Sequence, residues 1–142
     1  MSISMQNHGG YTEKYDNFDE KARMLGINYP DVNQYLSLIH ESDSALEYLI
    51  SYFEKVDDPV EIVFFGDHQP SLSSSFYPYL NGKGLGGLTL SELENLYTVP
   101  FFIWTNYDSG KEGVELTSLN YLSTLALERA GIALPAYNQF LA

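Results

Sequence analysis

Two continuous apolar runs, residues 60–65 and 99–105, stand out in the pattern of hydrophobic and polar positions. The first run does not alternate between apolar and polar residues, which is typical of a strand buried on both faces of a sheet. The second run predicts another strand, with Pro100 near its beginning, where a missing amide is tolerated. A shorter strand is expected at residues 2–6, before Asn7-His8-Gly9-Gly10.

Helical spacing dominates residues 32–56, which predict one long helix closed by Asp57-Asp58-Pro59. Asp31 and Gln34 have the spacing of a capping box at its start. Apolar or small residues recur along one face of this helix, with two more apolar residues beside them. These are Tyr35, Leu38, Ser42, Ala45, Leu49 and Phe53, and beside them Leu46 and Ile50.

The remaining segments predict two further helices separated by loops. Residues 88–97 predict a short helix with Ser91 and Glu94 as its capping box, and residues 117–135 predict a final helix stopped by Gly131 and Pro135. Residues 11–29 and 69–87 are expected to be loops, and residues 110–114 a turn into a short strand. Strands and helices alternate, so we expect an α/β fold, arranged as an α/β/α sandwich.

Composition and charge exclude several classes of function. The 142 residues carry 19 acids and 7 bases, a net charge of −12, and contain no cysteine. Nucleic acid would be repelled, and thiolate chemistry and disulfides are excluded. The start of the chain resembles no signal peptide, and no apolar run approaches the roughly 20 residues that span a bilayer. We therefore expect a soluble chain that does not itself insert into a membrane.

Asp67 and His68 directly follow the first apolar run. Ligands and metals gather at the carboxyl ends of strands in open α/β sheets, and a carboxylate and an imidazole both bind Zn²⁺ or Mn²⁺. An ordinary Gly-Asp turn explains the same residues, and two ligands alone do not complete a site. Both interpretations stay open on this motif alone.

Two other histidines differ in their settings. His8 follows the first short expected strand and precedes two glycines, so it can reach the same sheet edge or be a loop residue without a role. His40 lies among polar neighbours in the long helix, off its apolar stripe, and is expected to be solvated.

Five blocks, taken in order, resemble one family over nearly the whole chain. They are "ISMQNHGGY", "YLSLIHESDSALEYLISYFEKVDDP", "IVFFGDHQP", "VPFFIWTNYD" and "LNYLSTLALERAGIALPAYNQFL". They are similar to the C-terminal part of the extracellular domain of lipoteichoic acid synthase-like proteins. These proteins belong to the sulfatase branch of the alkaline phosphatase superfamily.

The resemblance implies a fold, a reaction and site residues. It implies one partial domain over residues 1–142, the C-terminal portion of an alkaline phosphatase/sulfatase-type sandwich with a mixed sheet. It implies transfer of phosphoglycerol or related groups from a lipid through a covalent phospho-threonine. A divalent metal assists, with Mn²⁺ first and Zn²⁺, Mg²⁺ or Ca²⁺ as alternatives. It places Asp67 and His68 among the metal ligands and His8 in the pocket for the phosphoglycerol head group.

Two departures limit what the resemblance implies. Gly10 stands where the family often has proline. The nucleophilic threonine and the remaining acidic ligand belong to a segment upstream of residue 1, so no catalytic residue is assigned within this chain. We expect the chain alone to be inactive, and the parent protein to act at the extracellular face of the membrane on a glycerophospholipid head group or a related phosphate or sulfate ester.

Two alternatives remain at this point. The chain could be a non-catalytic binding or assembly module that keeps the fold, with self-association through exposed sheet edges. It could also be a fragment of a sulfuric ester hydrolase, since sulfatases share the same metal chemistry and differ in the nucleophile.

Overall fold

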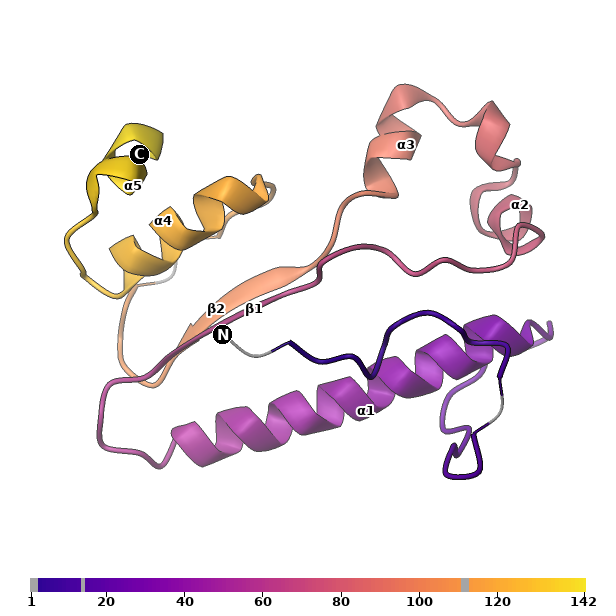
Figure 1. The fold of residues 1–142 in the computed structure, drawn as a ribbon, viewed down its shortest axis with the longest axis horizontal. Helices are drawn as coiled ribbons and strands as arrows, with labels where there is room; N and C mark the ends of the chain where they lie inside the picture. The colour runs from indigo at the N-terminus through magenta and orange to yellow at the C-terminus, as the bar shows by residue number, and fades with distance from the viewer. Residues whose placement is uncertain (1–2, 14, 111–112) are drawn as a thin grey trace. The chain divides into compact units, whose positions relative to one another are not determined.

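The computed structural model describes residues 3–13, 15–110 and 113–142. Helices and strands are interspersed along the chain, which confirms the α/β class (Figure 1). The elements are α1 (Pro30–Phe53), β1 (Glu61–Phe65), α2 (Phe76–Asn81), the 3-10 helix η1 (Leu85–Gly87), α3 (Leu90–Asn95), β2 (Phe101–Thr105), α4 (Leu119–Arg129) and α5 (Ala136–Leu141).

The backbone groups into two compact units. The first contains Met1–Ser51 and Gly66–Val99, and the second contains Tyr52–Phe65 and Pro100–Ala142. Asp67, His68 and His8 all belong to the first unit. The expectation of a single partial domain stays a prediction.

The long helix α1 confirms the predicted helix, but it begins and ends two to three residues earlier. The predicted capping box is wrong. Because Pro30 is the first helical residue, Asp31 lies in the first turn and not at the cap. Asp31 Oδ2 instead accepts a hydrogen bond from the Ser73 amide at 2.7 Å, and Gln34 Nε2 donates to the Glu13 carbonyl at 3.1 Å.

All four buried residues of α1 lie near its start: Val32, Asn33, Gln34 and Ser37. Three of these four are polar, so hydrogen bonds as well as apolar contacts hold the neighbouring segment of the same chain against the helix. The predicted apolar stripe is only partly covered further along, where Leu49 remains 40% exposed.

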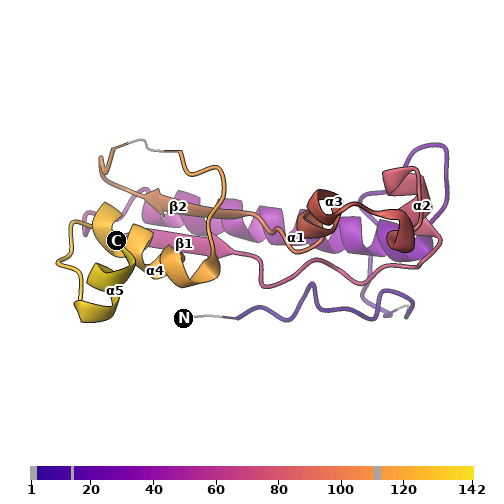
Figure 2. The ribbon, with the colours of Figure 1, turned by 90° about the horizontal axis from the view of Figure 1, so that it is seen from above.

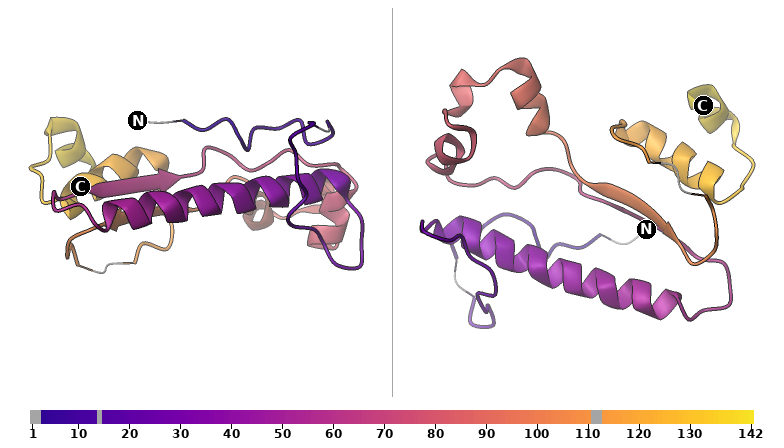
Figure 3. Two further views of the ribbon diagram at one scale, coloured as in Figure 1. Left: turned by 90° about the horizontal axis from the view of Figure 1, so that it is seen from below. Right: turned by 180° about the vertical axis from the view of Figure 1, so that it is seen from behind.

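The N-terminal segment, residues 3–29 where described, has no regular secondary structure and runs beside α1 (Figures 1 and 3). The strand predicted at residues 2–6 is therefore wrong for residues 3–6, since no other strand pairs with them; residue 2 lies outside the described residues. Ser42 Oγ donates to Asn7 Oδ1 at 3.1 Å and ties this segment to the helix.

Strands β1 and β2 pair antiparallel, and their arrows point in opposite directions in Figure 2. The register sets Ile62 opposite Trp104 and Phe64 opposite Phe102, and the two phenyl rings stack with centroids 5.2 Å apart. Both predicted strands are confirmed. Burial of the first on both faces is wrong here, because Phe64 and Phe65 stay 38% and 36% exposed.

That exposure has a simple cause. Among the described residues each strand has only the other as a ladder partner, so the sheet is two strands wide. A continuous apolar run indicates that both faces of a strand can be buried, but it does not indicate which elements pack against those faces. Self-association through the open edges stays a prediction.

The predicted loop at 69–87 is partly wrong, because α2 and η1 lie within it. The short helix α3 is confirmed with a different cap. Thr89 is the N-cap: its Oγ1 accepts from the Glu92 amide, and the Glu92 carboxylate accepts from the Thr89 amide. The strand predicted at 110–114 is wrong for Gly110, Gly113 and Val114; residues 111–112 lie outside the described residues.

The C-terminal segment forms two helices where one was predicted. Helix α4 ends before Gly131, whose φ of +67° suits glycine, as expected. Pro135 does not merely stop a helix, because it is also the N-cap of α5. The two helices pack together, and Asn138 Nδ2 donates to Thr124 Oγ1 at 2.9 Å (Figure 3). No helix in the described ranges has the length and apolarity to cross a membrane.

Candidate metal ligands and a neighbouring cavity

Asp67 and His68 lie in a bend immediately after β1 and Gly66. The bend is closed locally, because the Oδ1 atom of Asp67 accepts a hydrogen bond from the backbone amide of His68 at 2.9 Å. That contact fixes the carboxylate and leaves its Oδ2 atom available. Both side chains are exposed, at 82% for Asp67 and 65% for His68.

A carbonyl oxygen sets the tautomer of the His68 ring. The Nδ1 atom lies 2.9 Å from the Gln69 carbonyl oxygen, and a carbonyl can only accept, so Nδ1 carries the proton in this hydrogen bond. In the neutral ring, Nε2 then presents a lone pair. Histidines that bind a metal through one ring nitrogen commonly donate a hydrogen bond from the other to a backbone carbonyl in this way.

Gln69 is itself held in place. Its side-chain amide donates to the carbonyl of Thr98, which follows α3. The residue that orients His68 is thereby tied to Thr98, near the other end of the same segment, residues 66–99.

The two free atoms are close enough to share one cation. Nε2 of His68 lies 3.7 Å from Oδ2 of Asp67. Ligand atoms at about 2.0–2.2 Å from a zinc ion can be at most about 4.4 Å apart, so this spacing fits a common divalent ion. The spacing of the pair fits the predicted divalent metal.

A complete metal shell is not present in the described part of the chain. There, no group of three or more histidine, aspartate or glutamate side chains is close enough to hold an ion. His8 therefore does not join Asp67 and His68 in a ligand cluster.

His8 lies at a cavity of about 810 Å³ instead. Its backbone amide donates to the Met5 carbonyl at 3.1 Å, which forms the turn before Gly9 and Gly10. Gly10 has a φ of +115°, which proline cannot adopt because its ring fixes φ near −65°. The loop after His8 thus follows a path that the usual family proline would not permit.

Tyr11 connects the cavity with the surroundings of Asp67. Tyr11 is only 5% exposed, lines the cavity, and packs edge-on against Tyr35 with ring centroids 5.5 Å apart. Burial raises the pKa of the Tyr11 phenol, and the Tyr35 and Asp67 side chains raise it further. Its hydroxyl donates to the Asn7 carbonyl at 2.7 Å, so the ring position is fixed beside the His8 turn.

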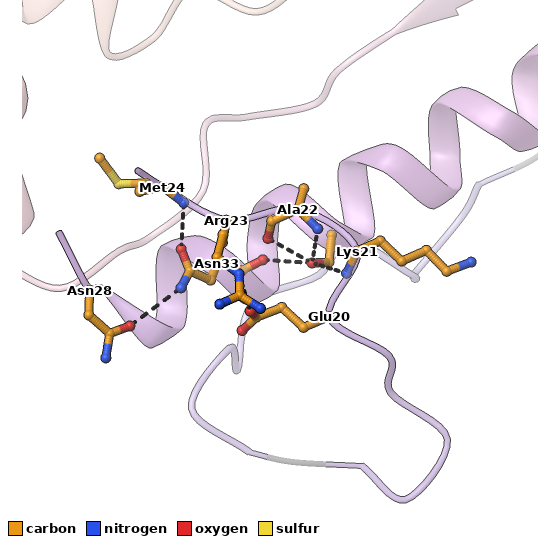
Figure 4. Close-up of polar contacts among 8 residues, drawn as sticks. Glu20, Lys21, Ala22, Arg23, Met24, Asn28 and Asn33 are labelled. Atoms are coloured by element: carbon orange, nitrogen blue, oxygen red, sulfur yellow. Dashed lines mark hydrogen bonds and ion pairs between the residues drawn. The ribbon is translucent and has the colours of Figure 1, made fainter. Parts of the chain in front are cut away.

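Polar contacts from α1 hold the other wall of the cavity. Ser37, only 1% exposed, accepts hydrogen bonds at its Oγ from the backbone amides of Lys21 and Ala22, both at 3.1 Å. Asn33 Oδ1 accepts from the Met24 amide at 2.9 Å, as Figure 4 shows. These bonds attach residues 20–28 to the helix and so position the lining residue Lys21.

Sequence reasoning missed several residues of this cavity, among them Tyr11, Lys21, Gln34 and Glu41. Lys21 and Glu41 form an ion pair with Nζ 2.5 Å from Oε1. Gln34 was assigned to a helix cap. The available signal was three polar residues with the spacing of one helix face, Asn33, Gln34 and Ser37, near the start of the helix.

Comparisons with known proteins give the family. The Sulfatase family model matches residues 1–132. The capsular polysaccharide biosynthesis protein RkpI of Rhizobium meliloti (strain 1021) is 40% identical over 76 residues, which are 54% of this chain and 12% of that protein. A putative cyclic beta-1,2-glucan modification protein of the same strain is 24% identical over 149 aligned positions, which cover 99% of this chain and 23% of that protein.

No solved structure matches the chain significantly. The chain spans less than a quarter of the length of either relative, and its mixed α/β structure with a small antiparallel sheet is consistent with a partial sulfatase/alkaline phosphatase-type domain. The match over residues 1–132 covers most of the 142 residues. The chain therefore belongs to the sulfatase family.

Proposed function

We propose that this chain supplies part of the catalytic centre of a metal-dependent phosphoglycerol transferase or hydrolase of the sulfatase family. One observation carries the proposal. His68 Nε2 and Asp67 Oδ2 lie 3.7 Å apart, and each is left available by a hydrogen bond made by the other polar atom of its side chain.

The metal's role in this proposal is simple. A bound divalent cation, Mn²⁺ first, would stabilise negative charge on the phosphoryl oxygens and activate a hydroxyl nucleophile. Asp67 and His68 would hold the ion, and Gln69 would keep the His68 ring in the correct tautomer. The family resemblance assigns the nucleophilic threonine to a segment outside these 142 residues.

His8 is proposed to bind the phosphoglycerol head group of the donor. Its position at the cavity rim supports this role, because the imidazole can donate a hydrogen bond to a phosphate oxygen. The protein would act at the extracellular face of the membrane, as the resemblance implies. The names of the two relatives concern a capsular polysaccharide and a cyclic glucan, so we propose a polysaccharide acceptor.

The direct test uses the full-length gene product that contains these residues. With Mn²⁺ and phosphatidylglycerol, the proposal predicts release of diacylglycerol and transfer of phosphoglycerol to a glucan. Asp67→Asn and His68→Ala should each lower kcat strongly, and His40→Ala, on an exposed helix surface, is the matched control. Hydrolysis of aryl sulfate without diacylglycerol release would instead support a sulfuric ester hydrolase.

The 142 residues alone are expected to be inactive, because the described part holds no group of three or more metal ligands. Turnover of a lipid or aryl phosphate by the pure chain would contradict this expectation. Binding of lipid head groups or polysaccharide without turnover by the full-length protein would favour the binding-module alternative.

A further inference from the structure

The cavity beside His8 has a lining that suits a neutral, hydroxyl-rich ligand. We propose that it is a subsite for one sugar unit of the polysaccharide acceptor. This inference rests on the proposed function, since it names the part of the chain that would bind the second substrate.

The cavity wall combines aromatic and polar side chains. Three aromatic side chains, Tyr11, Tyr15 and Phe18, line it together with the polar side chains of Asp19 and Gln34. Aromatic faces pack against apolar surface, while carboxylates and amides accept and donate hydrogen bonds in fixed directions. A sugar ring offers both kinds of surface, because hydroxyl groups surround faces of C–H bonds.

Gln34 contributes a side-chain amide to the cavity lining. This residue is 93% buried, lines the cavity, and donates from Nε2 to the Glu13 carbonyl at 3.1 Å. Within residues 3–13, 15–110 and 113–142, no group donates a hydrogen bond to its Oε1 atom. An amide oxygen in the lining of a cavity can accept a hydrogen bond from a sugar hydroxyl.

The charged side chains of the cavity wall disfavour an anionic ligand. Lys21 is the one lysine or arginine among the described lining residues, and its ammonium already contacts Glu41 at 2.5 Å. Asp19 adds a further negative charge to the wall. Sites built for phosphate or sulfate present arginine or lysine side chains that are free to contact the anion, and the described residues of this wall offer none. A neutral ligand is therefore favoured over a second anionic group.

The size and the position of the cavity agree with this role. A volume of about 810 Å³ lies within the range of about 300–1,000 Å³ typical of small-molecule sites. His8, proposed to contact the donor's head group, lies on the same wall. The donor phosphoglycerol and the acceptor sugar would then bind next to one another.

The test uses the 142-residue chain and sophorose, a β-1,2-linked glucose disaccharide, as the probe. In ¹⁵N–¹H NMR spectra, millimolar sophorose should shift the Gln34 side-chain amide and the Tyr15 backbone amide. Tyr15→Ala and Asp19→Asn should each weaken binding by about fivefold or more. The matched controls Tyr48→Ala and Asp43→Asn, both exposed on α1 and outside the cavity, should not.

Two results would overturn the inference. One is the absence of shifts at these amides, and the other is equal binding by Tyr15→Ala, Asp19→Asn and their controls. Inorganic phosphate at the same concentration should leave the Gln34 and Tyr15 signals unchanged, and shifts with phosphate alone would also count against a sugar. Mn²⁺ binding measured in the same samples separates this inference from the proposed function, because it tests Asp67 and His68 independently.

Discussion

Nε2 of His68 lies 3.7 Å from Oδ2 of Asp67. Each side chain uses its other polar atom, His68 Nδ1 or Asp67 Oδ1, for the hydrogen bond that orients it. Asp67 Oδ1 accepts from the His68 amide, and His68 Nδ1 donates to the Gln69 carbonyl. Three consecutive residues, Asp67, His68 and Gln69, thus orient the two ligand atoms, and the Gln69 side chain is held in turn by the Thr98 carbonyl. This local closure explains why an exposed bend can present two ligands in a defined geometry.

Ser37→Ala tests how the cavity wall is held. The change removes the acceptor for the Lys21 and Ala22 amides, so we expect a loss of about 1–3 kcal/mol in the free energy of unfolding. Urea denaturation measures the loss, and hydrogen exchange at these two amides should accelerate. Ser44→Ala, on the same helix but exposed, should change stability by less than about 0.5 kcal/mol. Equal effects of the two changes would contradict the role of Ser37.

Asn106→Ala tests the connection between α1 and β1 in the second unit. Asn106 Nδ2 donates to the carbonyls of Phe53, Val56 and Asp58, and its Oδ1 accepts from the Val60 amide at 2.8 Å. We expect a loss of about 1–3 kcal/mol, measured by urea denaturation.

Asn106→Asp should cost more than Asn106→Ala, because it sets a charged acceptor against three carbonyl oxygens. Asn120→Ala, at an exposed position of α4, is the control and should change stability by less than about 0.5 kcal/mol. If Asn106→Asp matched the wild type, the hydrogen-bond assignment would be wrong.

Glu92 gives a pH prediction for the start of α3. Hydrogen bonds from Lys83 and from the amide and hydroxyl of Thr89 lower the pKa of Glu92 from 4.5 to about 2. Because the folded pKa is depressed, the stabilisation is complete above the unfolded value and is lost as the pH falls from 4.5 through about 2. An NMR titration of the Glu92 carboxyl carbon should have its midpoint near the lower value.

Two variants check the cause of that shift. Lys83→Met should raise the Glu92 midpoint, because Lys83 makes the largest contribution through its contact of 2.8 Å with Oε2. Glu92→Gln should remove the pH dependence of α3 helicity in this window. A midpoint for wild-type Glu92 near 4.5 would show that the capping box does not form in solution.

The strands and helices that sequence reasoning located correctly are those with strong local signals. Continuous apolar runs correctly predicted β1 and β2, and helical spacing correctly predicted α1 and α4. The errors arose where partners far along the chain decide the outcome. Asp31 binds the amide of Ser73, 42 residues away, and not its own helix. The burial of Phe64 depends on what lies against the sheet, which no local pattern records.

In the candidate site, too, the residues with a local sequence signal were predicted and those brought together by tertiary packing were not. Asp67 and His68 were found from the sequence because they are adjacent and follow a strand, and His8 was placed through the family resemblance. The cavity beside His8 could not be predicted, because its wall joins residues such as Met5, His8 and Lys21 to Gln34, Leu38 and Glu41 on α1. Such convergence is a property of tertiary packing. The contacts that build it, such as Lys21 with Glu41, span long stretches of chain.

The measurement that tests the central claim most directly is a Mn²⁺ titration of the isotope-labelled chain, followed by paramagnetic broadening in NMR spectra. The account predicts weak binding that broadens the His68 ring signals at the lowest Mn²⁺ concentrations and leaves those of His40 sharp. Asp67→Asn should abolish the selective broadening, while Asp57→Asn with Asp58→Asn, an exposed acidic pair, should not. Broadening that is uniform over the acidic surface, or unchanged in Asp67→Asn, would contradict the proposed metal site.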